Sequence, residues 1–442
     1  MVKVRAQPIT QHHAAALAGQ AITAERYVSP DWLAREASEL WTKVWVFACL
    51  ERDVSEPGSF QVFDIGRESI VVSRAESGLH AFYNSCQHRG MRIANGRGCS
   101  KRFVCGYHGW TYRSDGRLVV VPDNDRFPGG VDRVTHSLQQ VQVATFAGMV
   151  FVCMDPAATP LLDYLGLAGE RMAAYRLEDM TLISDQTVGL ACNWKAVFDN
   201  FGELYHVEHI HPQHAELFDC PTARVDLFAN GHTGVSIDGH TVNQRVGVPE
   251  APNFYMEHQL KMYGIDPNEY VGRVLDVRRD MQKVRRDVAP KLGFDYDRLS
   301  DDRLTDIEQY NLFPNTMVTL TPDTGFIARA RPHPTDPDWC WWDKFTFRMA
   351  PSPDVAAQAG VAYEPYPSTL FEQPERPVHD EFDQEDVIAG RKTMGITLDQ
   401  DVHYIRDVQR GMHSRGFKAS RLCDDEARVQ HYHDWLMHWM GT

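Results

Sequence analysis

One short segment limits what this chain can be more than any other: residues 83–110, with the sequence YNSCQHRGMRIANGRGCSKRFVCGYHGW. It carries Cys86-x-His88 and, after sixteen intervening residues, Cys105-x-x-His108. Two thiols and two imidazoles at this spacing are typical of a metal centre. The residue types alone leave the identity of the metal open.

Two metal centres compete for this motif. A structural zinc ion accepts two Cys and two His, but zinc fingers usually place the two Cys together and the two His together. Here each arm carries one of each, which favours a Rieske-type [2Fe–2S] cluster with two Cys on one iron and two His on the other. Gly90, Gly106 and Gly109 would let backbone N–H groups approach the bridging sulfides. A chance surface arrangement is the least favoured interpretation.

The motif resembles the Rieske family, and its details favour one branch. Rieske proteins of respiratory complexes carry two further cysteines that staple the cluster loops, and a serine that donates to a sulfide. Met91, Tyr107 and Trp110 stand where those residues would fall. Fewer hydrogen bonds to the sulfurs imply a lower reduction potential, so the motif is similar to the oxygenase or ferredoxin type. Cys99, between the arms, is expected to be an ordinary buried or half-buried thiol.

Composition sets the wider frame. The 442 residues suffice for two domains, and 24% charged with 43% hydrophobic residues is typical of a soluble globular protein. A formal net charge of −15 argues against nucleic acid as a partner. The N-terminus lacks the apolar stretch of a secretion signal, and residues 146–154 are too few to cross a bilayer. Nine scattered cysteines predict reduced thiols, so we expect a cytoplasmic protein without membrane contact.

Hydrophobic periodicity divides the chain in two. Residues 29–47 predict a helix with Ser29 as its N-cap, and β-rich runs follow as far as about residue 155. These runs are FQVFDI, SIVVSRA, LHAFYN, RFVCGY, RLVVVP and MVFVCM. Later segments predict helices around 162–176, 194–209, 256–290, 401–412 and 424–439, strands within 316–349, and a long proline-rich loop at 351–395. The expected class is α+β, with an all-β domain and a larger mixed domain.

A second group of metal-binding residue types lies in CNWKAVFDNFGELYHVEHIHPQH (192–214). On a predicted helix, Glu203 and His206 are three residues apart and therefore adjacent. His211 follows His206 by five positions, about 140° round a straight helix, so both imidazoles reach one ion only if the helix bulges or ends. With one distant carboxylate they would form the two-His-one-carboxylate triad of non-haem Fe(II) oxygenases. The alternative is a polar surface loop, because the segment also holds His209 and His214.

Residues 380–407 hold several acids that could supply this carboxylate. In the Rieske oxygenases, which the two sites together resemble, the ligand Asp stands eight residues before a Gln-x-Gly in a closing helix. Asp401 stands eight residues before Gln409, and Gly411 follows. We therefore expect Asp401 to be the third ligand, with Asp399 and Asp386 as alternatives.

With both sites placed, the whole chain resembles the α (oxygenase) subunit of Rieske non-haem iron oxygenases, the family of ring-hydroxylating dioxygenases and related monooxygenases. This implies an all-β Rieske domain inserted near the N-terminus of a helix-grip-like catalytic domain, whose antiparallel sheet is wrapped by helices. The expected bounds are 1–42 for the N-terminal helical part of the catalytic domain, 43–158 for the Rieske domain and 159–442 for the remainder. A ring of three chains is also implied, while a β subunit is left open.

The resemblance further implies two cofactors. A [2Fe–2S] cluster would be held by Cys86, His88, Cys105 and His108, and a mononuclear Fe(II) by His206, His211 and Asp401. Electrons would come from NADH through a reductase, with or without a ferredoxin, and O₂ would oxidise a small organic substrate. Glu203 would bridge a cluster histidine of one chain to an iron-ligand histidine of its neighbour.

The expected activity is hydroxylation of an aromatic small molecule, with aromatic carboxylates among the candidates and with mono- and dioxygenation not distinguished. Residues 311–315 and 345–347 are candidate pocket segments. Glu203 stands where ring dioxygenases usually have Asp, and Glu there resembles the branch that oxidises quaternary ammonium compounds such as carnitine. That alternative calls for an aromatic cage, to which Trp341 and Trp342 could contribute. A non-catalytic Rieske electron carrier is the other alternative.

Overall fold

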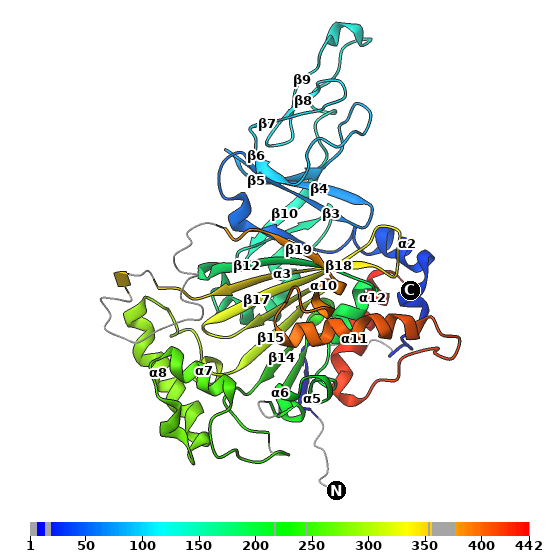
Figure 1. Cartoon of the computed structure of the whole chain (residues 1–442). Coiled ribbons are helices and arrows are strands. Elements are labelled where there is room, and N and C mark those ends of the chain that lie inside the picture. The colour runs from blue at the N-terminus through cyan, green and yellow to red at the C-terminus, as the bar shows by residue number, and fades with distance from the viewer. Residues whose placement is uncertain are drawn as a thin grey trace. The chain divides into compact units, whose positions relative to one another are not determined.

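The computed structural model describes residues 7–13, 19–215, 218–243, 245–351, 354–355 and 376–441. The chain forms two compact units (Figure 1). The smaller comprises Pro30–Tyr164, Pro332–Asp336 and His438–Thr442, and the larger comprises Met1–Ser29, Leu165–Arg331 and Pro337–Met437. The segment 43–158, expected to be the Rieske domain, lies within the smaller unit.

The smaller unit is built from antiparallel strands. A seven-stranded sheet has the order β2-β11-β10-β5-β4-β3-β6, and a three-stranded sheet has the order β7-β8-β9. The first sheet contains β2 Val46–Leu50, β3 Ser59–Ile65, β4 Glu68–Ala75, β5 Gly78–Tyr83, β6 Arg97–Cys99, β10 Gln140–Phe146 and β11 Met149–Cys153. The second contains β7 Arg102–Val104, β8 Thr111–Arg113 and β9 Leu118–Val120. The predicted β-rich runs are confirmed, although the strands β2, β6, β8 and β10 were not foreseen.

Two predictions for this unit are wrong. The helix expected at 29–47 is α2 Pro30–Glu39 only, and Val46 already begins β2. The run Val44–Phe47 alternates β-branched and aromatic residues, which fit a buried strand better than a helix. Cys99 is exposed rather than buried, because it lies on the short edge strand β6, where every residue is exposed. Cys86 and Cys105, by contrast, belong to the buried apolar core.

The larger unit is organised around a nine-stranded sheet of order β1-β13-β14-β15-β16-β17-β18-β12-β19. Neighbours from β13 to β17 pair antiparallel, as do β12 and β18, while the edge strands β1 and β19 pair parallel. The strands are β1 Ile9–Gln11, β12 Thr181–Leu190, β13 Arg224–Leu227, β14 Thr233–Ile237, β15 Ile307–Leu312, β16 Thr316–Leu320, β17 Thr324–Pro332, β18 Cys340–Arg348 and β19 Asp380–Asp383. The strands predicted within 316–349 are therefore confirmed.

Helices accompany this sheet, and α3 Leu161–Ala173 runs across the boundary between the units. The others lie in the larger unit, except for the last two residues of α12: α1 Glu25–Val28, α4 Trp194–Asn200, α5 Val207–Ile210, α6 Pro212–Ala215, α7 Phe254–Met262, α8 Val277–Leu292, α10 Gln384–Ile388, α11 Ile396–Met412 and α12 Ala427–Trp439. The single helix expected at 256–290 is divided into α7 and α8, because Gly264, Pro267 and Gly272 interrupt it.

The proline-rich loop expected at 351–395 is only partly testable. Residues 352–353 and 356–375 lie outside the described residues. Further on the prediction is wrong, because β19 and α10 occupy 380–388 and an Asp383–Asp386 capping box starts α10.

Helix α11, in orange in Figure 1, is the element that carries Asp401. Its buried residues are Leu398, Asp401, Val402, Ile405 and Gln409. The Gln409 amide accepts a hydrogen bond from the Asn193 backbone N–H at 3.1 Å, just before α4 begins. Helix α11 thus presents an acid on its buried face and is tied to the segment that precedes the histidines.

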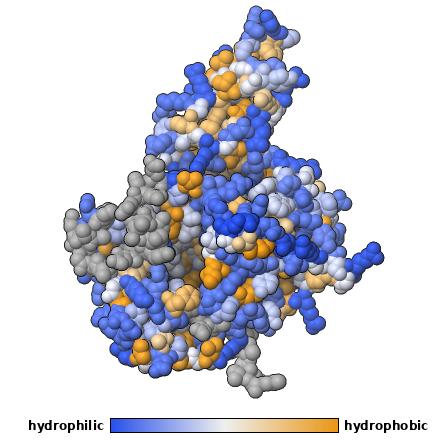
Figure 2. Space-filling model, viewed as in Figure 1, coloured by the Kyte–Doolittle hydropathy of each residue, from blue (hydrophilic) through white to orange (hydrophobic). Residues whose placement is uncertain are grey.

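The face shown in Figure 2 is largely hydrophilic, with apolar residues scattered over it singly and in small groups. In the part of the chain that the structure describes, no helix is both long and apolar enough to cross a membrane.

Candidate metal centres and active site

The first motif folds into two loops of the same shape. In each, the cysteine N–H donates to the carbonyl five residues later, and the cysteine carbonyl accepts from the glycine N–H four residues later, at 2.8–2.9 Å. In the first loop Cys86 bonds with Met91 and Gly90, and in the second loop Cys105 bonds with Trp110 and Gly109. The φ angles of Gly90 and Gly109 are +79° and +71°, which side chains rarely tolerate. Each loop therefore turns back tightly on its cysteine.

The cysteine ligands of the first motif are buried more deeply than its histidine ligands. Both thiols are 2% exposed, whereas His88 is half-buried and His108 is exposed. The Nδ1 atoms of these two imidazoles lie 3.0 Å apart. Thiols inside and imidazoles outside suit a cluster whose Cys-held iron is buried and whose His-held iron is near the surface.

Spacing separates the cluster from a single zinc ion. Four ligands of one tetrahedral zinc would lie about 3.3–3.8 Å from one another. Among the residues that the structure describes, only His206, His211 and Asp401 form a group of three or more His, Cys, Asp or Glu whose ligand atoms all lie within 4.8 Å of one another. The Cys/His quartet is more widely spread, as two metal ions require.

Tyr112, on β8, is a contact that the sequence did not reveal. Its hydroxyl lies 3.3 Å from Sγ of Cys86 and accepts the backbone N–H of Gln87 at 3.0 Å. Because that N–H occupies an acceptor position, the hydroxyl proton is free to point at the sulfur. The residue stands outside the Cys-x-His spacing, so only the strand pairing brings it to the cluster loop.

The helix expected through 194–209 is wrong in its middle. Helix α4 ends at Asn200, and the chain becomes helical again only in α5 and α6. A Cβ on Gly202 would stand 2.9 Å from the Asp199 carbonyl oxygen, and the Gly202 N–H donates to that carbonyl at 2.7 Å. This tight turn redirects the chain. Leu204 and Val207 then pack into a core cluster with β13 and β14, which fixes the His206 segment.

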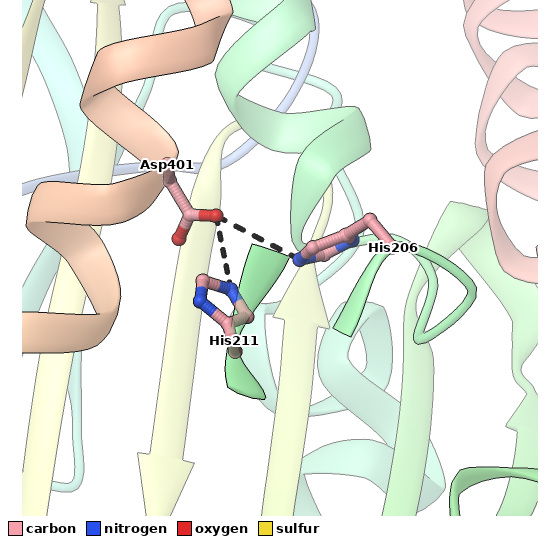
Figure 3. Close-up of side chains that lie close together, drawn as sticks. All are labelled: His206, His211 and Asp401. Atoms are coloured by element: carbon pink, nitrogen blue, oxygen red, sulfur yellow. Dashed lines mark ion pairs between the residues drawn. The ribbon is translucent and has the colours of Figure 1, made fainter. Parts of the chain in front are cut away.

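The turn brings both predicted histidines to Asp401. Nε2 of His211 lies 3.2 Å and Nε2 of His206 lies 3.7 Å from Oδ1 of Asp401 (Figure 3). Asp401 is 5% exposed, and among the described residues its Oδ1 has no correctly aligned hydrogen-bond donor. A buried carboxylate oxygen that faces two imidazole nitrogens without such a donor suits a bound cation.

Each imidazole is held from behind. Nδ1 of His206 contacts Glu203, whose other oxygen accepts the His206 backbone N–H at 3.0 Å. Nδ1 of His211 lies 2.7 Å from Oε1 of Gln400, on α11. With Nδ1 donating, each Nε2 keeps its lone pair for a metal. Burial opposes protonation of His211, but the nearby Asp401 carboxylate outweighs it and raises the pKa of His211.

The alternative ligands lie elsewhere. Asp399 accepts from the Thr393 hydroxyl at 2.6 Å and from the Met394 N–H at 2.7 Å. Asp386 is paired with Arg391 at 2.7 Å. Nε2 of His214 lies 2.8 Å from the Thr397 hydroxyl. The described geometry thus groups His206 and His211 with Asp401 rather than with these residues.

The triad opens into a cavity of about 450 Å³. Its lining is mainly apolar and includes Phe201, Phe218, Ile237, Ile307, Phe326 and Leu398. Of the predicted pocket segments, 311–315 contributes nothing to the lining and 345–347 contributes only Thr346. Trp342 is buried against Phe201, and Trp341 lies against Arg331, so the cage predicted from these two residues is wrong.

Comparison with known proteins covers both units. Residues 172–442 match the family "Ring hydroxylating alpha subunit (catalytic domain)", and residues 44–146 match "Rieske [2Fe-2S] domain". The anthranilate 1,2-dioxygenase large subunit of Acinetobacter baylyi is 34% identical over 200 residues, which are 43% of this chain and 42% of that protein. The glycine betaine monooxygenase oxygenase subunit of Pseudomonas aeruginosa is 32% identical over 180 residues, 40% of this chain and 42% of that protein. The chain thus spans about two fifths of the length of the curated relatives it matches.

Solved structures agree in fold. A quaternary ammonium Rieske monooxygenase in complex with L-carnitine has a TM-score of 0.64 at 19% identity, with 95% of each chain covered. Naphthalene 1,2-dioxygenase from Rhodococcus sp. has a TM-score of 0.63 at 22% identity, covering 95% of this chain and 94% of that one. The catalytic family match alone takes in more than half of the chain. The chain therefore belongs to the ring-hydroxylating alpha subunit family, which joins a Rieske [2Fe–2S] domain to a catalytic domain that binds mononuclear iron.

Proposed function

We propose that this chain is the oxygenase component of a Rieske oxygenase. In this proposal Cys86, His88, Cys105 and His108 hold the [2Fe–2S] cluster, and His206, His211 and Asp401 hold Fe(II). One observation carries the proposal. At the wall of an apolar cavity, two histidines held at Nδ1, His206 and His211, face a buried Asp401 carboxylate oxygen that accepts no hydrogen bond from the described residues.

The division of labour between cofactors and protein follows from this arrangement. When bound, the two iron centres supply the electrons and the O₂ activation that the side chains lack. Glu203 and Gln400 hold the two imidazoles in one tautomer and one direction. The apolar lining keeps water away from the reacting atoms and binds the hydrocarbon part of the substrate.

The proposed substrate is an aromatic small molecule. Three phenylalanines, Phe201, Phe218 and Phe326, line the cavity and offer flat apolar faces to a ring. Relatives named for anthranilate and naphthalene support this choice. A quaternary ammonium substrate is the second candidate, favoured by relatives named for glycine betaine and carnitine and by Glu203 in place of the usual Asp.

Partners and assembly complete the proposal. Family members take electrons from a reductase or a ferredoxin, so we include an NADH-dependent reductase, with or without a ferredoxin, as the electron source. We further propose a ring of three chains and a cytoplasmic location.

Metal analysis and isotope labelling test this function. The purified chain should contain about two cluster irons and one further iron. His206→Ala should remove only the last of these. With NADH, reductase and ¹⁸O₂, aromatic substrates should gain labelled oxygen, which mass spectrometry detects. Zinc in place of iron, no iron beyond the cluster, or products without label would overturn the proposal.

A further inference from the structure

The cavity has one charged side chain that the metal site does not use. Lys344, on β18, is the single lysine or arginine among the lining residues. Its ammonium group lies 5.9 Å from the ring centroid of Phe326, on β17. Phe326 is in turn the register partner of Thr319, on β16. These three residues, together with the triad, line the same cavity.

Lys344 lacks a counter-ion. Its ammonium group donates to the Met394 carbonyl, a neutral acceptor, and no carboxylate among the described residues lies within 4.0 Å of it. Asp399 is the carboxylate whose charge acts on Lys344, yet that side chain is occupied by Thr393 and Met394. Two of the three ammonium protons are left to the cavity.

A second polar group in the lining also lacks a partner. The Thr319 hydroxyl is buried and has no hydrogen-bond partner among the described residues. Burial lowers the pKa of Lys344 to about 8, so most of the side chain stays charged at neutral pH. A buried cation without a counter-ion is costly, and such groups cluster at sites where a ligand completes them.

We infer that Lys344 binds the carboxylate of an anionic substrate, whose apolar part then lies along the phenylalanines toward the iron triad. This inference rests on the proposed function and narrows its substrate to aromatic carboxylates. A cationic ammonium compound without a carboxylate is disfavoured, because Lys344 repels it across the apolar cavity. The carboxylate supplies the missing counter-charge, and its second oxygen has the Thr319 hydroxyl available in the same lining.

Equilibrium binding tests the charge without turnover. The holoenzyme is titrated calorimetrically, in the absence of O₂, with two pairs that differ by one charge: benzoate against benzamide and 2-naphthoate against 2-naphthamide. The unchanged protein should prefer each carboxylate by about tenfold or more, as expected for a charge-assisted hydrogen bond. Lys344→Met should lose this preference while binding the amides as before, and Lys344→Arg should retain part of it.

Lys261→Met is the matched control, because Lys261 is an exposed lysine of α7 paired with Glu257 and outside the cavity. It should keep the preference in full. Failure of both carboxylates to bind, equal binding of acids and amides, or a preference that survives in Lys344→Met would overturn the inference.

Labelled O₂ separates this inference from the proposed function. If label enters aromatic substrates but the unchanged protein binds acids and amides equally, the oxygenase function stands and the carboxylate site falls. If carboxylates bind through Lys344 but no substrate gains label, the oxygenase function falls while the anion site stands.

Discussion

Glu203 lies beside His206 in the structure although no helix joins them. One carboxylate oxygen faces Nδ1 of His206, and the other accepts its backbone N–H at 3.0 Å. Glu203→Gln keeps the shape but removes the charge that holds the imidazole. We expect both metal centres to remain loaded while reoxidation of the reduced cluster slows by orders of magnitude, measured by stopped-flow absorbance with O₂ and substrate. Glu203→Asp should be milder.

Glu208→Gln provides the control for Glu203. Glu208 lies in the same segment but pairs with Arg245 at 2.7 Å instead of with a ligand histidine. Its substitution should leave the reoxidation rate unchanged. Reoxidation at the normal rate in Glu203→Gln would remove Glu203 from the electron route.

A second prediction for a single residue concerns Tyr112, whose hydroxyl lies 3.3 Å from Sγ of Cys86. A hydroxyl that donates to a cluster sulfur stabilises the more negative, reduced state. Tyr112→Phe should therefore lower the reduction potential, by about 40 mV if the hydrogen bond contributes about 1 kcal/mol. A redox titration followed by the visible spectrum measures this.

Tyr107→Phe is the comparison for Tyr112. The Tyr107 hydroxyl is exposed and accepts from Arg89 at 3.3 Å, so its loss should leave the potential unchanged. Equal potentials for all three proteins would show that the Tyr112 hydroxyl does not act on the cluster.

At the scale of elements, helix α11 supplies one metal ligand and also the side chain that orients a second ligand, His211. Asp401 faces the ion position, and Gln400, one residue earlier, holds Nδ1 of His211 at 2.7 Å. Gln400→Ala should weaken Fe(II) binding about 10–100-fold, the usual cost of losing a group that orients a metal ligand. Competition with a chelator under anaerobic conditions gives the affinity.

The control for α11 is Gln213→Ala. Gln213 donates to Gln400 at 2.7 Å and accepts from it at 3.2 Å, and neither hydrogen bond involves a ligand histidine. Its removal should leave the Fe(II) affinity close to that of the unchanged protein. If Gln400→Ala binds Fe(II) equally tightly, the orientation of His211 comes from elsewhere.

Elements also show where the sequence was informative. Runs rich in β-branched and aromatic residues predicted β3, β4, β16 and β18 well, because such side chains favour strands wherever they are buried. The helix prediction for the segment after Asn200 was wrong. The apolar spacing there is helical, but Gly202 packs against the Asp199 carbonyl and turns the chain. Local periodicity does not register such a turn.

The candidate ligands were accessible for a different reason: Cys-x-His, Cys-x-x-His and His-x4-His are short local spacings. Their supports are not local. Gln400 stands 189 residues from His211, and Lys344 reaches Met394 across 50 residues. Only the pairing of distant elements brings these side chains together, so no spacing rule reveals them.

At the scale of the whole molecule, the two metal centres lie in two compact units, and their loading should be separable. Cys86→Ser should remove the cluster and abolish NADH-driven turnover, while iron bound by His206, His211 and Asp401 remains. Iron per chain, the cluster absorbance and turnover with reductase are measured together. Repeated turnover of this variant with NADH would show that the cluster is structural instead of a relay.

The way the two imidazoles are held has a consequence for the amount of protein as well as for its activity. Both Nδ1 atoms are engaged, so two nitrogen lone pairs and a carboxylate oxygen converge without a donor among them and repel one another until a positive charge arrives. Binding of Fe(II) to the folded chain alone is then mass action: at one hundred times its dissociation constant the ion adds about 2.7 kcal/mol to the free energy of unfolding. The midpoint of thermal unfolding should rise as free Fe(II) rises, and should do so much less in Asp401→Ala. When iron is scarce, a larger fraction of the chain is therefore unfolded. Proteases degrade the unfolded chain, so the amount of folded protein falls.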